Sequence, residues 1–156
     1  MNLDKIESFP RKDVLLAYLA SVPAGLFGIT QIQKGMFLVW KNVPNVFETQ
    51  YEFEAESYGP RAKGIHTDLD ILMDCKLVKM VTDPASYTNV RDYLATPAGL
   101  KLAQDTILKE MNPKFQDYFR RLAEWVLEQT FTDLVRTVIQ NHPEMGTNMI
   151  FQRGKE

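Results

Sequence analysis

His66 and Asp70 are four residues apart in the sequence, and Cys75 follows five residues after the aspartate. Four residues make about one turn of a helix, and imidazole, carboxylate and thiolate groups gathered in this way are zinc ligands. A closed zinc site takes four ligands, however, and the other histidine, His142, lies far along the chain before a proline. We therefore expect neither a metal nor any other cofactor.

Other residue patterns that carry out reactions are missing from the sequence. It contains neither the glycine-rich loop with a lysine that holds nucleotide phosphates nor the Gly-x-Ser-x-Gly turn of many hydrolases. Asp68 and Asp70 are close enough in sequence to suggest an acid–base pair, but residues two apart on a helix point to different sides. We expect no catalytic residues and a protein that is not an enzyme.

The bulk composition is that of one globular domain. The chain has 156 residues, of which 45% are hydrophobic and 24% are charged. Eighteen Lys and Arg residues against twenty Asp and Glu residues give a net charge of −2, and no part of the chain is strongly basic. Proteins that depend on DNA phosphates usually concentrate positive charge, so this distribution disfavours DNA binding.

Apolar runs, the first residues and the cysteine content predict where the protein works. No apolar run is long enough to cross a bilayer. Asp4 and Glu7 stand where a signal peptide carries positive charge, and the lone Cys75 suits a reducing compartment. We expect a cytoplasmic protein that has no membrane contact and in which Cys75 is packed against neighbouring residues.

The spacing of apolar residues predicts the order of the helices and strands. Apolar residues recur at helical spacing in six segments: 11–21, 30–43, 60–74, 97–111, 114–128 and 131–141. Strands are predicted at 51–56, 77–81 and 91–95, the last two forming a hairpin. This order favours an α+β fold, with a winged helix-turn-helix core over residues 1–111 and a helical extension over 112–156 packed on it as part of one domain.

Three local features predict where these helices begin and how they pack. Thr30 and Gln33 have the spacing of a capping box, which stabilises a helix start by about 1 kcal/mol. Gly59 ends the strand before it, and Pro60 suits the first position of the third helix. Gly35 lies inside the second helix, where glycine costs about 1 kcal/mol, and this favours close packing over contact with a partner.

The outward face of the third helix holds the candidate contact residues. Its core stripe is centred on Ile65 and Leu69, and Thr67 is the one plausible reader of DNA bases opposite it. Asp74 has the wrong charge for DNA, whereas an outward Ile71 suits a protein contact unless the C-terminal helices cover it. We expect five residues to contact a partner protein: Arg61, Lys63, Thr67, Ile71 and Asp74.

A DNA-binding transcriptional regulator is the alternative function. Such a protein would hold phosphates through Arg61, Lys63 and four further polar or basic residues: Gln31, Gln33, Lys34 and Arg91. The late helices leave another alternative open. Their large aromatic residues are predicted to form a second layer of core, but they would also suit a homodimer interface: Phe115, Phe119, Trp125 and Phe131.

Several sequence blocks resemble one family. The first block is ITQIQKGMFL (29–38), and the second runs from YEF (51–53) to YGP (58–60). The third contains DL (68–69), Leu72 and LV (77–78), and the fourth contains YLAT (93–96) and Gly99. The fifth runs from Phe131 through Leu134 to HPE (142–144). In order and spacing they resemble the SocA-like or Panacea family, which includes YwgA-like and phage-associated winged-helix proteins. The resemblance implies a non-enzymatic antitoxin or adaptor that masks or delivers a partner protein, such as a co-encoded toxin. A subunit of a phage-defence assembly is the third alternative.

Overall fold

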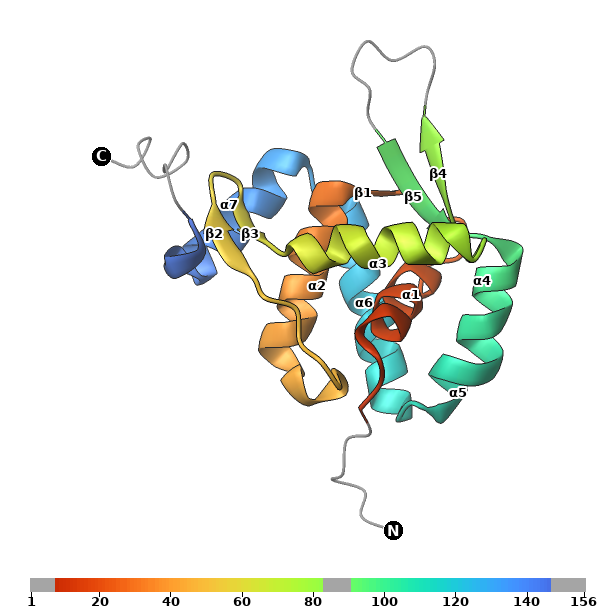
Figure 1. Ribbon diagram of the computed structural model, residues 1–156. Coiled ribbons are helices and arrows are strands. Elements are labelled where there is room, and N and C mark those ends of the chain that lie inside the picture. Colours follow the sequence, from red (N-terminus) through yellow and green to blue (C-terminus); the bar gives the residue numbers. More distant parts are fainter. Residues whose placement is uncertain (1–7, 83–90, 147–156) are drawn as a thin grey trace.

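The computed structural model describes residues 8–82 and 91–146 (Figure 1). Its fold is mixed α+β. The first half contains, in order, α1 (Arg11–Ala20), β1 (Phe27–Gly28), α2 (Ile29–Asn42), a 3-10 turn (Pro44–Val46), β2 (Glu54–Glu56), β3 (Gly59–Arg61) and α3 (Lys63–Asp74). The second half contains β4 (Val78–Thr82), β5 (Arg91–Ala95), α4 (Pro97–Leu102), a π-helical turn (Ala103–Ile107), α5 (Leu108–Glu110), α6 (Pro113–Glu128), α7 (Phe131–Asn141) and a 3-10 turn (Pro143–Met145).

The strands form two small antiparallel sheets. One has the strand order β1-β5-β4, with Phe27 opposite Tyr93 and Val78 opposite Ala95, and the other consists of β2 and β3. The predicted hairpin of residues 77–81 and 91–95 is thus confirmed to within one residue, and its connecting loop at 83–90 lies outside the described residues. The two-residue strand β1 was not predicted, because it is too short to show an alternating pattern.

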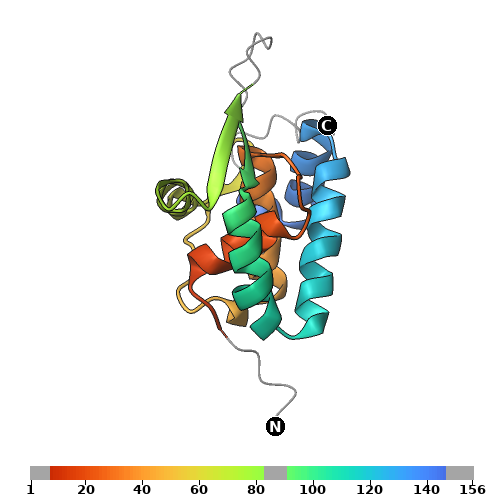
Figure 2. The same ribbon diagram turned by 90° about the vertical axis from the view of Figure 1, so that its right-hand side faces the viewer.

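The helices lie in layers. Figure 2 shows α3 on one side of the molecule and α6 on the other, with α1 and α2 between them. Contacts of α1 with both α3 and α6 agree with this view. The late helices therefore pack on the face of the central layer that is remote from α3, and they leave the outward face of α3 open.

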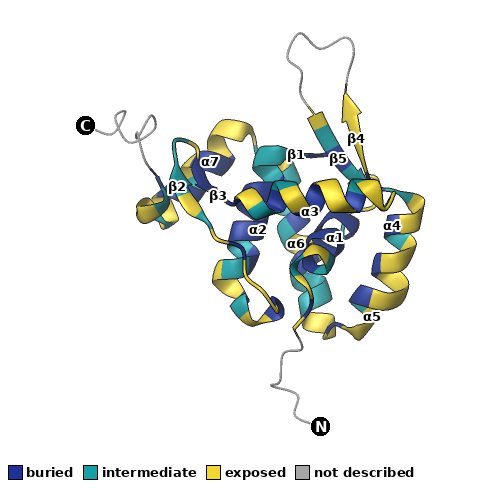
Figure 3. Cartoon of the chain, viewed as in Figure 1, coloured by how far each residue is buried: buried dark blue, intermediate teal, exposed yellow. Residues whose placement is uncertain are grey.

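The core consists of two buried clusters that together reach from the first helix to the last. Every residue from Val14 to Ala20 in α1 is buried, because this helix is covered on both sides (Figure 3). Phe119 and Ala123 of α6 belong to the same buried cluster. A second cluster joins Phe37 of α2 to the late helices through Val126, Leu134 and Val138. The apolar stripes of α6 and α7 therefore pack against the first part of the chain.

Gly35 confirms the prediction of close packing. A Cβ atom built on Gly35 would lie 2.0 Å from the Tyr18 hydroxyl oxygen, which is closer than any real contact. Tyr18 is fully buried, and its hydroxyl donates a hydrogen bond of 3.0 Å to the Gln31 carbonyl oxygen. The glycine thus lets α2 approach α1 closely enough for this buried hydrogen bond to form.

Three helix starts follow their capping residues. Thr96 Oγ1 accepts a hydrogen bond of 3.0 Å from the Gly99 amide, and Thr130 Oγ1 accepts one of 3.1 Å from the Asp133 amide. Asn112 Oδ1 accepts a hydrogen bond of 2.9 Å from the Lys114 amide. These side chains satisfy amides that have no partner within the helix. The starts predicted from Thr96 and Thr130 are confirmed.

The predicted capping box of α2 is wrong. The helix begins at Ile29, and Gln31 Oε1 accepts a hydrogen bond of 2.8 Å from the Gly28 amide, two residues earlier than the box of Thr30 and Gln33 requires. Gln33 is buried and exchanges two hydrogen bonds with the Ala62 backbone, at 3.0 and 2.8 Å. The tertiary contact with the end of β3 therefore takes the side chain that the sequence pattern assigned to the cap.

The predicted strand at 51–56 and helix start at Pro60 are also corrected. The strand covers only Glu54–Glu56, and Gly59–Arg61 forms its antiparallel partner, so that α3 begins at Lys63. Gly59 has φ of +93°, a conformation that favours glycine, and it makes the tight turn between the two strands. Pro60 is tolerated because a two-stranded sheet consists only of edge strands.

Candidate functional site

The outward face of α3 is exposed as predicted. Lys63, Thr67 and Asp74 are exposed, and the side chain of Ile71 is 40% accessible. This orientation follows from the buried stripe of the same helix, which contains Ile65, Leu69 and Leu72. The C-terminal helices do not cover Ile71, so the alternative that it is part of the core is wrong.

Charges on the α3 face are mixed. Lys63 lies at the start of the helix, whereas Asp70 and Asp74 lie along its exposed side. A surface that reads DNA normally presents positive charge to the phosphates, and carboxylates repel them. The face therefore combines an apolar centre at Ile71 with a charged rim, which is the usual anatomy of a protein interface.

Asp68 has a structural role that the sequence analysis missed. The residue is buried, its Oδ2 accepts a hydrogen bond of 2.6 Å from the Tyr51 hydroxyl, and Arg11 Nε lies 3.0 Å from the same oxygen. Arg11 also lies over the Tyr51 ring, with its Cζ 4.7 Å from the ring centre. Asp68 falls on the apolar stripe between Ile65 and Leu69, and this position was the signal for a buried carboxylate.

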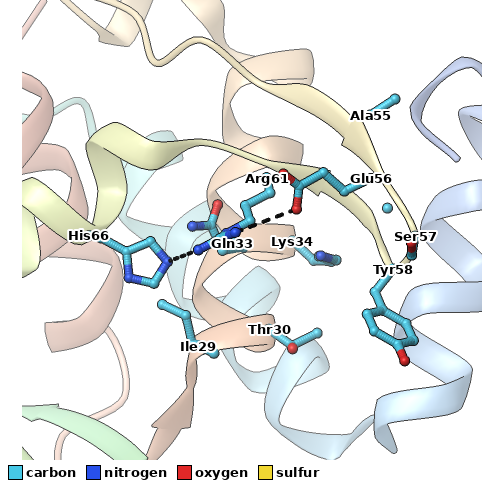
Figure 4. Close-up of a pocket in the computed structure, with 11 residues that line it drawn as sticks. Ile29, Thr30, Gln33, Lys34, Ala55, Glu56, Ser57, Tyr58, Arg61 and His66 are labelled. Carbon is cyan, nitrogen blue, oxygen red and sulfur yellow. Dashed lines mark hydrogen bonds and ion pairs between the residues drawn. The ribbon is translucent and has the colours of Figure 1, made fainter. Parts of the chain in front are cut away.

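A cleft of about 580 Å³ opens between the start of α2, the β2–β3 hairpin and the first turns of α3 (Figure 4). We call it the Lys34 cleft. Its lining combines apolar, hydroxyl, amide and charged groups: Ile29, Thr30, Gln33, Lys34, Ala55, Glu56, Ser57, Tyr58, Gly59, Arg61 and His66. The cleft was not predicted, because its walls come from three segments that are separate in the sequence.

Lys34 is the buried cation of this cleft. The residue is only 4% accessible, and its Nζ donates a hydrogen bond of 3.1 Å to the Pro60 carbonyl oxygen. Burial is the main cause that lowers the pKa of Lys34 to about 8; the charge of Glu56 opposes this shift, and the charge of Arg61 adds to it. Gln33 and Lys34, both predicted to contact nucleic acid, are buried, and their side chains donate hydrogen bonds to the Ala62 and Pro60 carbonyl oxygens.

Arg61 lies on β3 rather than on the α3 face, and its guanidinium contacts two neighbours (Figure 4). Its Nη1 lies 3.6 Å from Glu56 Oε2, and its Nη2 lies 3.3 Å from His66 Nε2. A guanidinium can only donate, so His66 Nε2 accepts and the neutral ring carries its proton on Nδ1. Two effects lower the pKa of His66: partial burial, which is the larger, and the positive charge of Arg61. Both favour this neutral form.

A second cleft of about 620 Å³ adjoins the first and shares Ile29, Thr30 and His66 with it. Its other walls come from β5, the start of α2 and the start of α7: Gly28, Gln31, Arg91, Asp92, Tyr93, Phe131 and Leu134. Gln31 and Arg91, predicted as phosphate contacts, thus line one concave surface. The structure places Asp92 on that same surface, which makes its charge mixed.

Two exposed aromatic rings stand near the clefts. Tyr58 of the β2–β3 turn is 48% accessible and Phe131 of α7 is 49% accessible, and their ring centres are 5.4 Å apart in an edge-to-face arrangement. The prediction that the large aromatic residues of the late helices form a core layer holds for Phe119, which is fully buried. It is wrong for Phe131, which begins α7 and faces outward.

The possible metal ligands do not gather. His66 lies in the clefts beside Arg61, and within residues 8–82 and 91–146 no group of three His, Cys, Asp or Glu side chains could hold a metal ion. Cys75 follows the end of α3 and is exposed, so the prediction that it is packed is wrong.

No protein-family model matches this chain, and no curated protein matches it. The resemblance to SocA-like proteins thus remains a prediction that rests on the sequence blocks alone. Among the helices of residues 8–82 and 91–146, none combines the length and the apolar character that crossing a bilayer requires.

Proposed function

We propose that this protein is a cytoplasmic, non-enzymatic winged helix-turn-helix protein that binds a partner protein through the outward face of α3. In the antitoxin or adaptor role that the sequence resemblance implies, the contact masks the partner or delivers it elsewhere. The observation that carries the proposal is the exposed Ile71, which lies on α3 beside Asp74 and which no other helix of the described chain covers.

The order of the elements supports the winged-helix part of the proposal. Helices α1, α2 and α3 are followed by the β4–β5 hairpin, and β1 pairs with β5 to complete a three-stranded sheet. The hairpin projects from the body of the molecule next to the end of α3 (Figure 1). In DNA-binding relatives of the helix-turn-helix design, the second helix of the motif enters the major groove. The proposal assigns the place of that helix to α3.

The charge distribution favours a protein partner over DNA. Arg61 is occupied by Glu56 and His66, Lys34 is buried, and Asp74 faces outward from α3. Of the basic residues predicted to hold phosphates, Lys63 and Arg91 remain as exposed cations that form no ion pair within the described residues, and they favour the DNA-binding alternative. Two such contacts provide little of the counterion release on which DNA affinity depends.

The test compares two surface substitutions while the protein is produced together with the products of its neighbouring genes. Ile71→Glu places a charge in the centre of the proposed interface, and Leu102→Glu places one on α4 at a residue with a similar accessibility of 37%. We expect Ile71→Glu to abolish co-purification of the partner and Leu102→Glu to retain it. Equal capture by both variants would contradict the proposal.

Gel-shift titration at low and moderate salt tests the alternative. Tight DNA binding whose affinity falls steeply with salt, and which is lost in Arg91→Gln but retained in Ile71→Glu, would favour a transcriptional regulator. Weak binding that does not depend on Arg91 is the result expected for a protein-binding module.

A further inference from the structure

Lys34 carries a buried charge that the described residues do not neutralise. Its ammonium group has three donors, and the Pro60 carbonyl is its one hydrogen-bond acceptor among those residues. No carboxylate of the described chain forms an ion pair with it, since the nearest candidate, Glu56, pairs with Arg61 instead. A buried charge without a counter-ion is costly, and a methionine of similar size would fill this position without that cost.

The free donors of Lys34 belong to a cavity rather than to close-packed core. Figure 4 shows its amino group in the space between α2 and the β2–β3 hairpin, with Arg61 and Glu56 on one side and Tyr58 on the other. Gly59 lies against the lysine stem, since a Cβ atom there would be in ordinary van der Waals contact with Lys34 Cε at 3.4 Å. The β2–β3 turn thus covers the aliphatic part of the Lys34 side chain, and the amino group lies beside the cleft.

Further donors point to a negatively charged ligand. Ile29 and Thr30 begin α2 and line the cleft, and the first amides of a helix lack acceptors within it. The Thr30 hydroxyl and the Arg61 guanidinium lie on the same cleft. Glu56 is the single carboxylate in its lining, so the two cations leave an excess of positive charge.

The cleft also offers apolar surface for the rest of a ligand. Ile29 and the half-exposed Tyr58 ring form part of its wall, and the adjoining second cleft continues past Ile29 to Phe131. Volumes of this size are typical of sites for small molecules that combine apolar walls with a few placed polar groups.

We infer that the Lys34 cleft binds a small organic anion, with a phosphate or carboxylate group held by Lys34 and Arg61 and a flat or apolar body against Ile29 and Tyr58. Such an anion would accept hydrogen bonds from the unused N–H groups of Lys34 and would neutralise the buried charge. Ile71 is not among the residues that line the cleft, so ligand binding does not require the protein contact proposed above.

Titration of the full chain, followed by amide NMR shifts and by the melting temperature, tests this inference with four probes. AMP presents a phosphate on a flat body, benzoate presents a carboxylate on one, adenosine lacks the anion and inorganic phosphate lacks the body. We expect AMP or benzoate to bind at least about tenfold more tightly than adenosine or inorganic phosphate, a difference of about 1.4 kcal/mol. The anion that binds identifies the ligand class.

Three variants locate the binding. Lys34→Met should abolish it while leaving the protein folded, and Arg61→Gln, on a half-exposed side chain, should weaken it several-fold. Lys41→Met is the matched control, because Lys41 lies on the same helix but pairs with Glu144 at 3.8 Å and does not line the cleft. It should bind like the wild type.

The inference is overturned if neither AMP nor benzoate shifts the resonances of the cleft at about 10 mM, or if Lys34→Met and Arg61→Gln both bind as the wild type does. It is also overturned if adenosine binds as tightly as AMP and benzoate does not bind. Ile71→Glu should retain anion binding, and Lys34→Met should retain the partner protein, so that failure of one proposal leaves the other standing.

Discussion

The Tyr51 hydroxyl lies 2.6 Å from Asp68 Oδ2, and this hydrogen bond ties the segment before β2 to the buried side of α3. Arg11 reaches the same carboxylate oxygen from α1 at 3.0 Å. Three segments therefore meet at one buried carboxylate. Because α3 carries the proposed interface on its other side, this cluster fixes the orientation of that interface.

Tyr51→Phe should lower the free energy of unfolding by about 2 kcal/mol, because it removes a hydrogen bond to a charged, buried acceptor. The chemical-denaturation midpoint measures this change. Tyr58→Phe is the matched control: Tyr58 is 48% accessible and its hydroxyl makes no hydrogen bond within the described residues, so its change should be within about 0.5 kcal/mol. Equal losses in both variants would show that the Asp68 cluster contributes little.

Gly35→Ala should destabilise the protein although alanine favours helices. The added Cβ would lie 2.0 Å from the Tyr18 hydroxyl oxygen, and Tyr18 is fully buried and cannot move aside. Overpacking of this kind costs about 1–3 kcal/mol or more, which exceeds the gain of about 1 kcal/mol in helix propensity. A fall in melting temperature measures it.

Gly64→Ala is the control for that substitution. Its Cβ would lie 3.0 Å from the Arg11 guanidinium, which is paired with Asp68 but 30% accessible and needs to shift by only a few tenths of an ångström. We expect Gly64→Ala to change the melting temperature far less than Gly35→Ala does. Similar losses at both glycines would contradict the packing explanation.

Stability should rise with pH above neutrality because of Lys34. Its pKa is about 8 in the folded protein against 10.5 for an ordinary lysine, so between these values the unfolded chain binds more protons than the folded one. Folding is therefore favoured as the pH increases through this window, by about 2 kcal/mol between pH 7 and 9.5. Urea unfolding at a series of pH values measures this gain.

Lys34→Met should flatten that pH profile and should equal or exceed the wild type in stability at pH 7, because it removes a buried charge. Measurements should stay below pH 10. Burial raises the pKa of Tyr18 and Tyr51, so above that pH ionisation of tyrosines in the unfolded chain opposes folding. An unchanged profile in Lys34→Met would show that another group titrates.

Substitutions at the neighbouring residues Ile71 and Leu72 of α3 should change stability by very different amounts. Leu72→Ala should cost about 2–5 kcal/mol, because Leu72 is buried in the main core. Ile71→Glu should change stability by less than about 0.5 kcal/mol, since Ile71 is exposed. Thermal unfolding of both variants measures the difference, and a large loss for Ile71→Glu would mean that it packs against other residues.

Local patterns predicted the helices well where the controlling interactions are local. Thr130 and the stripe from Leu134 to Ile139 define α7 within one turn, and Thr96 marks the start of α4. The pattern before α3 predicted a helix start at Pro60 where the structure has a strand, because Gly59 and Pro60 are compatible with both a helix start and a tight hairpin. Pairing of Ala55 with Pro60 selected the hairpin, and such pairing is not visible in local spacing.

The sequence by itself determined the helical order, the buried stripe of α3 and hence the outward direction of Ile71, because these depend on the 3.6-residue period of a single helix. Only the tertiary structure decided that Lys34 is buried in a cleft, that Asp68 is held by Tyr51 and Arg11, and that α6 leaves α3 uncovered. The physical reason is that a charge acquires its environment from segments distant in the chain. Local periodicity carries no information about which of these segments meet.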